Sequence, residues 1–330
     1  MFNLVLSDMS IEPKRIDRLD KQADSEITIR GYDPDKMGVP PELRRKEWFL
    51  PVNEIVSDYC PTDRYLYLTK IAKKSAEPTW ERFKGQVIDE LYPDLFKTFS
   101  SYMEQSKLAT LQIREALESF KSSRLEKIRK SYEKEKEKLM KPPTNSEFTD
   151  FLNGVGKIIR YEIQLCSAIL DFKVSMKKDI RLKSEFAILF PFVSKPKLLA
   201  LELGFSEGQE PDFIYANRVL CDVKTGKWRE SFLLTLAAYA LAFENENKKP
   251  MNLGVIINPV LDKNRNVPLY LNSEIVIIGD EYRKIVKALR DKKLEFMKNA
   301  KDPSKPTDDK MCTSCGFHDI FCWRDKNGSD

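Results

Sequence analysis

Glu210-Pro-Asp-Phe-Ile-Tyr215 and Cys221-Asp-Val-Lys-Thr-Gly226 are the two stretches that decide the fold of the second half of this chain. Both are short runs rich in residues that favour strands. Ala216-Asn217 lies between them and can form a hairpin turn, because asparagine tolerates left-handed backbone geometry. The sequence therefore predicts two neighbouring strands that carry acidic side chains near their ends.

Pairing of these strands would bring Asp212 close to Asp222. Alternate residues of a strand share a face, so Asp222 and Lys224 point the same way. Two carboxylates are hard oxygen ligands for Mg²⁺ or Mn²⁺, and such an ion activates water and stabilises charge on a phosphoryl group. A lysine beside them can orient the attacking water, and its burial close to the metal is expected to depress its pKa. This grouping predicts phosphodiester hydrolysis, although a D-x-K triplet alone also occurs on solvated strand ends.

Strand-forming and helix-forming runs are mixed on either side of the hairpin, which indicates an α/β unit with a central sheet. We expect further strands at residues 186–190, 198–203, 253–257 and 274–278, and helices at 230–244 and 280–299. The front half is expected to be irregular up to about residue 50 and helical after it. Its helices are predicted at 52–74, with a break at Cys60-Pro61, from Thr79 as N-cap, at 108–140, and from Asn145 or Ser146 to Met176.

Composition narrows the classes of function. The 330 residues carry a net charge of +5, which permits binding to a polyanion without requiring it. His318 is the one histidine, which excludes mechanisms that need several imidazoles. No membrane-length apolar run and no secretory signal are found, so we expect a cytoplasmic protein without a membrane partner and with reduced thiols.

The segment from Lys121 to Lys141 holds nine Lys or Arg and four Glu. Such a segment is typical of a solvated helix with Glu–Lys pairs along its surface. It could also serve as a surface for nucleic acid. We favour the first interpretation.

Three cysteines lie close together near the end of the chain, and the C-x-x-C spacing lets two sulfurs reach one centre from a tight turn. A tetrahedral or cubane site needs a fourth ligand, and the cysteine at the predicted helix break is the best candidate. Four thiolates suit zinc and an iron–sulfur cluster equally, and His318 could replace one ligand in a zinc site. The predicted ligands are Cys60, Cys312, Cys315 and Cys322, whereas Cys166 and Cys221 are interpreted as buried apolar residues.

The P-D-F and D-V-K-T-G stretches resemble motifs II and III of the RecB-like branch of the P-D…D/E-x-K nucleases. Leu234-Thr-Leu-Ala-Ala-Tyr239 resembles its Q-x-x-x-Y motif, with Thr235 at the glutamine position. By this resemblance Asp212, Asp222, Lys224 and Tyr239 are catalytic. Motif I of the branch has a histidine four residues after a glycine, and in Gly85-Gln-Val-Ile-Asp89 that position is an aspartate.

The departure at motif I leaves alternatives open. Asp89 could be a third ligand beside Asp212 and Asp222, or it could mark weakened activity, or it could be a surface residue of an amphipathic helix. Glu90 is the neighbouring alternative ligand.

The four cysteines around such a core resemble the CRISPR-associated RecB-like exonucleases, which carry a 4Fe–4S cluster. Leu43-Arg-Arg-Lys-Glu-Trp48 and Cys60-Pro-Thr-Asp-Arg-Tyr65 resemble the archaeal type I-A variant. The resemblance implies a helical N-terminal part (1–180), an α/β nuclease core (181–300) and a cluster tail (301–330) that packs back on the first part. It implies a Mn²⁺- or Mg²⁺-dependent DNA exonuclease that acts on single-stranded ends during spacer acquisition with the CRISPR integrase subunits. The alternatives are a non-catalytic DNA-binding or scaffold subunit, and a zinc protein of unrelated function.

Overall fold

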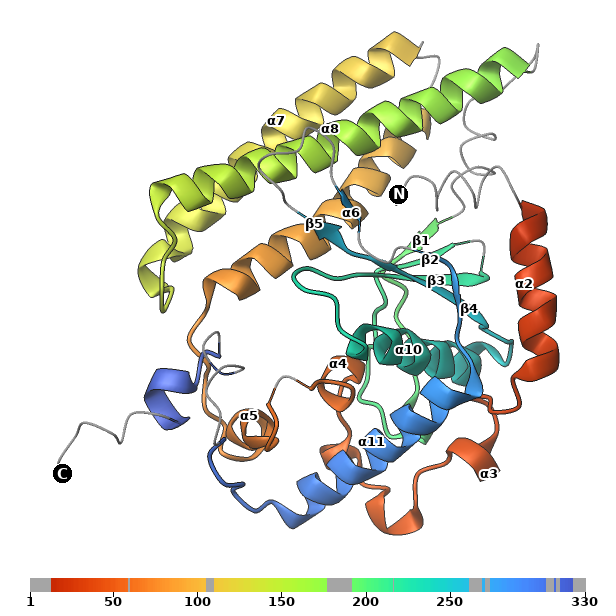
Figure 1. Ribbon diagram of the computed structural model, residues 1–330, viewed down its shortest axis with the longest axis vertical. Helices are drawn as coiled ribbons and strands as arrows, with labels where there is room; N and C mark the ends of the chain where they lie inside the picture. The colour runs from red at the N-terminus through yellow and green to blue at the C-terminus, as the bar shows by residue number, and fades with distance from the viewer. Residues whose placement is uncertain are drawn as a thin grey trace.

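The computed structural model describes residues 13–58, 60–104, 110–176, 192–215, 217–260, 269–270, 274–306, 312 and 315–322. A central sheet has helices on both faces (Figure 1). The mixture of strands and helices confirms the α/β class. In the part of the chain that is described, no helix has the length and apolarity to cross a membrane.

The sheet has five strands in the order β1-β2-β3-β4-β7. They are β1 (Phe192–Ser194), β2 (Phe213–Tyr215), β3 (Val219–Val223), β4 (Leu253–Ile257) and β7 (Val276–Ile277). Only the β3–β4 pair is parallel. The predicted hairpin joins β2 to β3, and Asn217 in its turn has a φ of +55°. A separate pair is formed by β5 (Pro259–Val260) and β6 (Leu269–Tyr270).

One face of the sheet is covered by three long helices, α6 (Trp80–Glu104), α7 (Thr110–Glu135) and α8 (Asn145–Met176). Odd-numbered residues of the strands face them, among them Phe213, Cys221 and Val255. This apolar core spans the predicted boundary between the helical part and the nuclease part; the three-part division itself stays a prediction.

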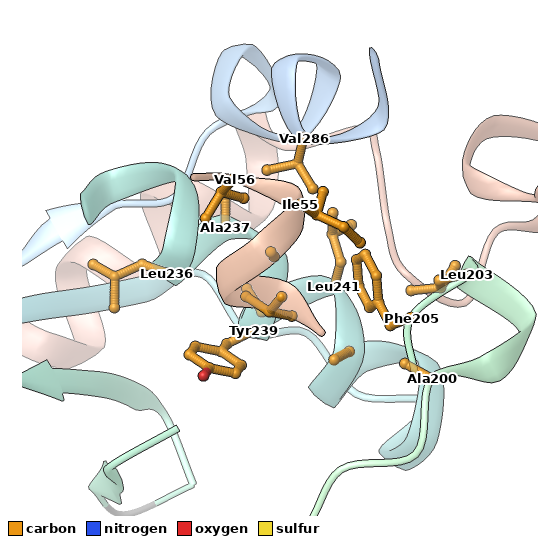
Figure 2. Packing of buried hydrophobic residues seen from close by; sticks show 14 of the residues in the cluster. Ile55, Val56, Ala200, Leu203, Phe205, Leu236, Ala237, Tyr239, Leu241 and Val286 are labelled. Atoms are coloured by element: carbon orange, nitrogen blue, oxygen red, sulfur yellow. The ribbon is translucent and has the colours of Figure 1, made fainter. Parts of the chain in front are cut away.

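The other face is covered by α10 (Ser231–Asn247), with α11 (Asp280–Asn299) and α4 (Val52–Ile55) packed behind it. Figure 2 shows Leu241 of α10 near Ile55 and Val286. Because α10 lies between the sheet and these helices, residues all round it are buried from Thr235 to Asn245. A helix buried on all sides needs an apolar surface all round, which its sequence provides.

The front of the chain forms short elements around this core. They are α2 (Pro13–Glu26), α3 (Pro34–Met37), α5 (Arg64–Leu66), a π-helical turn (Tyr67–Ile71) and 3-10 turns at Pro41–Leu43, Lys46–Trp48 and Lys136–Lys138. The prediction of an irregular start was wrong for residues 13–26. The break between α4 and α5 at Cys60 was predicted correctly.

Two helix N-termini show how local sequence sets the boundaries. Thr79 caps α6, since its hydroxyl accepts a hydrogen bond from the Arg82 N–H at 3.3 Å. Thr144 caps α8, one residue earlier than predicted. The Glu147 N–H donates to the Thr144 hydroxyl at 3.2 Å and the Glu147 carboxylate accepts from the Thr144 N–H at 2.8 Å, which completes a capping box.

One predicted strand was wrong. Residues 198–203 form an isolated bridge from Leu198 to Gln209 and then a 3-10 turn at Leu201–Leu203. The run contains no β-branched residue, and Gly204 after it has a φ of +73°, which closes the turn. The strand predicted at residues 186–190 lies outside the described residues.

A buried ion network holds the front segment against α10 and α11. Glu244 has no exposed surface, and its carboxylate contacts Arg30 at 3.1 Å and Arg283 at 2.7 Å. It also accepts hydrogen bonds from the backbone N–H groups of Gly31 and Met251 at 2.7 and 3.0 Å. Because every lone pair of this carboxylate is used, its removal would leave Arg283 buried without a carboxylate partner in the described part of the chain and would leave Arg30 with Asp24 alone, at 3.0 Å.

We therefore expect Glu244→Ala to lower the free energy of unfolding by roughly 3–5 kcal/mol. Urea denaturation followed by circular dichroism measures this change. Glu246→Ala is the matched control, because Glu246 lies on the exposed side of the same helix, and its effect should stay below about 1 kcal/mol. Equal effects of the two substitutions would contradict a structural role for the network.

Candidate active site and cysteine cluster

Asp212 and Asp222 lie opposite each other at one end of the β2–β3 hairpin. The last registered pair of that ladder is Phe213 with Cys221, and the two aspartates are the next residues outward. The Asp212 carboxylate accepts a hydrogen bond from the Val223 N–H at 2.7 Å. The pairing of the strands thus brings the two predicted carboxylates together.

The Asp212 carboxyl is held mainly in its neutral form. Burial and the nearby charge of Asp222 together raise its pKa to about 8, against the opposing effect of the hydrogen bond from Val223. Two carboxylates that share a buried site cannot both ionise without a compensating positive charge.

Lys224 supplies part of that charge. Its ammonium lies 2.6 Å from Asp222 Oδ2. Burial lowers the pKa of Lys224, but the charges of Asp222, Asp212 and Asp89 outweigh burial, so the pKa is raised overall. The predicted depression of the Lys224 pKa concerned a lysine close to a bound metal ion, and it stays a prediction. Asp222 Oδ2 is buried, and within the described residues the Lys224 ammonium is its ion-pair partner.

Asp89 reaches the same group from α6. Burial raises the pKa of its carboxyl to about 6, while Lys224 lowers it and Asp222 raises it. Gly85, one turn before Asp89, lies near Thr225: a Cβ at Gly85 would be 3.7 Å from the Thr225 hydroxyl, an ordinary contact distance. Glu90, the alternative, faces α7 and contacts Arg124 at 3.2 Å. The geometry thus favours Asp89 over Glu90.

α10 contributes Tyr239 and Thr235. Figure 2 shows the Tyr239 ring with its hydroxyl directed away from the labelled apolar side chains. Burial raises its pKa, as do the charges of Asp222 and Asp212, and a side-chain hydrogen bond with Asn53 lowers it. The Thr235 hydroxyl donates to the Ser231 carbonyl at 3.1 Å, so the shorter side chain at the glutamine position is bound to its own helix.

Three polar residues near the carboxylates were not found by sequence reasoning. Asn53 binds Tyr239 from α4. Asn258 follows β4, is fully buried, and its amide donates to the Gly226 carbonyl at 3.4 Å. Lys195 follows β1, and its backbone N–H donates to the Asp212 carbonyl at 2.9 Å. Each belongs to a segment far from the motifs, and only a correct sheet order could have placed it.

The cysteines form a second group, built where the tail meets the front of the chain. The Glu77 N–H donates to the Gly316 carbonyl at 3.1 Å, and a Cβ at Gly316 would lie 2.2 Å from the Glu77 carbonyl oxygen. The Phe317 ring packs on Tyr65 with centroids 5.3 Å apart. Figure 1 shows the resulting proximity of the last helical turn (His318–Cys322) to α5.

Cys312, Cys315 and Cys322 are buried and Cys60 is half-buried. Burial raises the pKa of the Cys322 thiol, Arg64 lowers it, and Cys315 and Cys60 raise it, which brings three of the four sulfurs into one electrostatic group. The Tyr65 N–H lies 3.4 Å from Cys60 Sγ and donates to it. Cys221 is buried in the core, as predicted; Cys166 lies in α8, and its side chain is outside the described part.

A cavity of about 890 Å³ is lined by residues from both regions, among them Lys224 and Thr225 from the first and Cys60 and Gly316 from the second. Lys227, Arg229, Phe232 and Thr235 also line it. Positive and negative side chains alternate along the wall, since Arg229 pairs with Asp58 at 3.5 Å and Lys293 with Asp63 at 3.5 Å.

The chemistry of both groups fits a metal. Grouped carboxylates with raised pKa values are stabilised by a divalent cation, and grouped buried thiols are stabilised by iron or zinc. Within the described residues no three such side chains already surround a common ion position.

The fold and the site together define a class of protein: it is an α/β protein whose central sheet carries carboxylates and a lysine at the ends of its strands. The chain belongs to the family of the CRISPR-associated exonuclease Csa1, whose sequence profile matches residues 4–323. A relative with that name from Saccharolobus solfataricus is 26% identical over 95% of this chain and 97% of its own length. These matches confirm the resemblance to CRISPR-associated exonucleases.

The raised pKa of Asp212 predicts how stability depends on pH after treatment with a chelator. In the unfolded chain an aspartate ionises near pH 4, and in the folded protein Asp212 ionises near pH 8. The folded state therefore holds more protons in this window, and the stability that Asp212 contributes falls as pH rises from about 4 to about 8.

Asp212→Asn should flatten this dependence, because an amide cannot ionise and can still accept the Val223 hydrogen bond. Urea denaturation at several pH values between 4.5 and 8.5 tests the expectation. Asp35→Asn, at an exposed position, should keep the wild-type curve. A wild-type curve that parallels that of Asp212→Asn would contradict the buried, protonated state of Asp212.

Proposed function

We propose that this protein is a metal-dependent DNA exonuclease that processes DNA ends for the acquisition of CRISPR spacers. The observation that carries the proposal is the pairing of half-buried Asp212 with buried Asp222 beside Lys224, in a chain of an exonuclease family. Placing two carboxylates together lowers the stability of a protein. Their presence therefore indicates that a function requires them.

Asp212 and Asp222 would hold Mn²⁺ or Mg²⁺, with Asp89 as a third ligand. When bound, the ion lowers the pKa of water and stabilises negative charge on the phosphoryl oxygens. A third carboxylate can replace the motif I histidine because both ions prefer oxygen ligands.

The side chains around the ion have separate tasks. Lys224 is anchored by Asp222 and keeps its proton, so it acts as a donor toward the phosphate or the attacking water. Tyr239 also keeps its proton, and its hydroxyl, oriented by Asn53, would contact the substrate. With its pKa near 6, Asp89 changes charge close to neutral pH, which suits a ligand whose occupancy depends on pH.

The substrate would be DNA with a single-stranded end that enters the cavity beside Lys224. Phe232 offers an aromatic face to an unpaired base, and Lys227 offers charge to the backbone. The partners would be the CRISPR integrase subunits, as the resemblance to this family implies. This part of the proposal rests on family membership and on the cavity.

The four cysteines would hold a 4Fe–4S cluster. Cys60 and Cys312 are 312 − 60 = 252 residues apart, so the cross-link would restrict the unfolded chain by roughly 5 kcal/mol on a loop-entropy estimate. The backbone N–H on Cys60 Sγ and the basic Arg64 beside Cys322 support thiolate ligands. The cluster would be structural, since it would fasten the tail against the wall of the cavity.

Lys224→Ala is expected to lower the rate of DNA degradation by roughly 100- to 1000-fold, because the ammonium acts on charge that develops during hydrolysis. The assay uses end-labelled single-stranded DNA with Mn²⁺ or Mg²⁺. Lys284→Ala, on the exposed side of α11, is the control and should keep the wild-type rate.

The same assay separates the enzyme from its alternative. The Asp89 substitution at motif I favours a second candidate, a non-catalytic DNA-binding or scaffold subunit. If wild type and Lys224→Ala both bind DNA and leave it intact, the exonuclease proposal fails and the scaffold proposal stands.

Anaerobically purified protein is expected to be brown and to contain about four iron atoms per chain if a cubane cluster is bound. Cys60→Ser should reduce the iron content and lower the melting temperature, because one ligand is lost. Cys221→Ser is the control and should retain the iron, since Cys221 lies in the core away from the tail. Stoichiometric zinc in a colourless wild-type sample would contradict the proposal of an iron–sulfur cluster.

A further inference from the structure

Lys195 lies in the same row as the two central carboxylates. β1 pairs with β2 up to Ser194 and Phe213, and the Lys195 N–H then donates to the Asp212 carbonyl at 2.9 Å. Asp222 lies opposite Asp212 on the next strand. Lys195, Asp212 and Asp222 therefore occupy one level across three neighbouring strands, although they come from three separate stretches of sequence.

The backbone of Lys195 is held in an unfavourable conformation. Its φ is +44°, in the left-handed region that costs free energy for any residue with a Cβ. Pro196 follows it, and Leu198 is already bridged to Gln209, so the chain must turn at this residue. A strained residue beside a site is a reason to look for a function of its side chain.

Among the described residues, the Lys195 ammonium also has no ion-pair partner, unlike the neighbouring lysines. Lys224 is bound to Asp222 at 2.6 Å, and Lys197 lies 4.0 Å from Glu210. Lys195 is exposed, and across the described ranges no acidic group lies within 4.0 Å of it. Its charge nevertheless reaches the carboxylate group, because it lowers the pKa of Asp89.

We propose that Lys195 is a phosphate-binding residue that positions the DNA backbone one phosphate away from the bond that is cut. The inference rests on the proposed nuclease function. An exposed ammonium loses little hydration before it meets a phosphate, and its contact is sequence-independent. Lys224 cannot take this task because Asp222 holds it at the reacting centre.

The variants separate the effect of the side-chain charge from the effect of the backbone conformation. Lys195→Gly removes the ammonium and tolerates positive φ, Lys195→Arg keeps the charge, and Lys248→Gly is the matched control. Lys248 also has a positive φ, +53°, and is exposed, but it lies beyond the C-terminal end of α10. Similar melting temperatures of the two glycine variants would show that the fold is retained.

Binding of fluorescent single-stranded DNA is measured by anisotropy at several salt concentrations, with Ca²⁺ in place of the reactive ions. Lys195→Gly should weaken binding by roughly five- to tenfold and reduce the slope of log K against log salt by about 0.7, the value for one phosphate contact on a single strand. Lys195→Arg should stay near wild type, and Lys248→Gly should change neither quantity. In turnover with Mn²⁺, KM should rise while kcat changes by less than about threefold.

A scan with single neutral methylphosphonates locates the contact. One position beside the cleaved bond should weaken wild-type binding and have no further effect on Lys195→Gly, because the same contact is already lost. Identical Kd values and salt slopes for Lys195→Gly and Lys248→Gly would overturn this inference even if DNA is cut normally. Absence of cleavage by wild type, with the Lys195-dependent slope intact, would remove the proposed hydrolysis and leave the phosphate contact standing.

Discussion

The close approach of two carboxylates at adjacent strand ends, with Asp222 buried and Asp212 half-buried, is the constraint on which the rest of this structure depends. Asp212 and Asp222 are forced together by the register of the β2–β3 hairpin, and Lys224 compensates only one of them. The result is a carboxyl with a pKa near 8 inside a rigid sheet. Such a site is unfavourable for stability alone, because a group that must stay protonated or bind a cation limits the conditions under which the protein is stable.

The surrounding fold supplies the stability that this site lacks. α10 is buried on every side, between the sheet and the pair α4 and α11, and its apolar surface fills that space. Glu244 near its end joins Arg30 and Arg283 in a fully compensated ion network. The two clusters of polar side chains thus differ in their charge balance. Around Glu244 all charges are matched within the protein, whereas the carboxylates near Lys224 remain under-compensated and can accept a ligand.

The cavity between the carboxylates and the cysteines gives the tail a clear place in the proposed activity. Gly316, Cys60 and Lys224 all line this cavity. Close contact of Gly316 with Glu77 fixes the tail against the segment before α6, and α6 in turn carries Asp89. A displacement of the cysteine group would therefore shift α6 and with it the position of Asp89 beside the other carboxylates.

The sequence by itself determined the local features, because they depend on residues close in the chain. The hairpin turn at Asn217, the cap of α6 and the break at Cys60 follow from short-range preferences, and the alternation of β3 placed Cys221 opposite to Asp222. It failed at residues 198–203, where Gly204 closes a turn instead of continuing a strand. Only the tertiary structure decided which polar side chains meet: that Asp89 faces the carboxylates while Glu90 faces α7, that Asn53 reaches Tyr239, and that Lys195 shares a row with Asp212. These contacts depend on the order of strands and the packing of helices across long stretches of chain, and such long-range packing leaves no local pattern in the sequence.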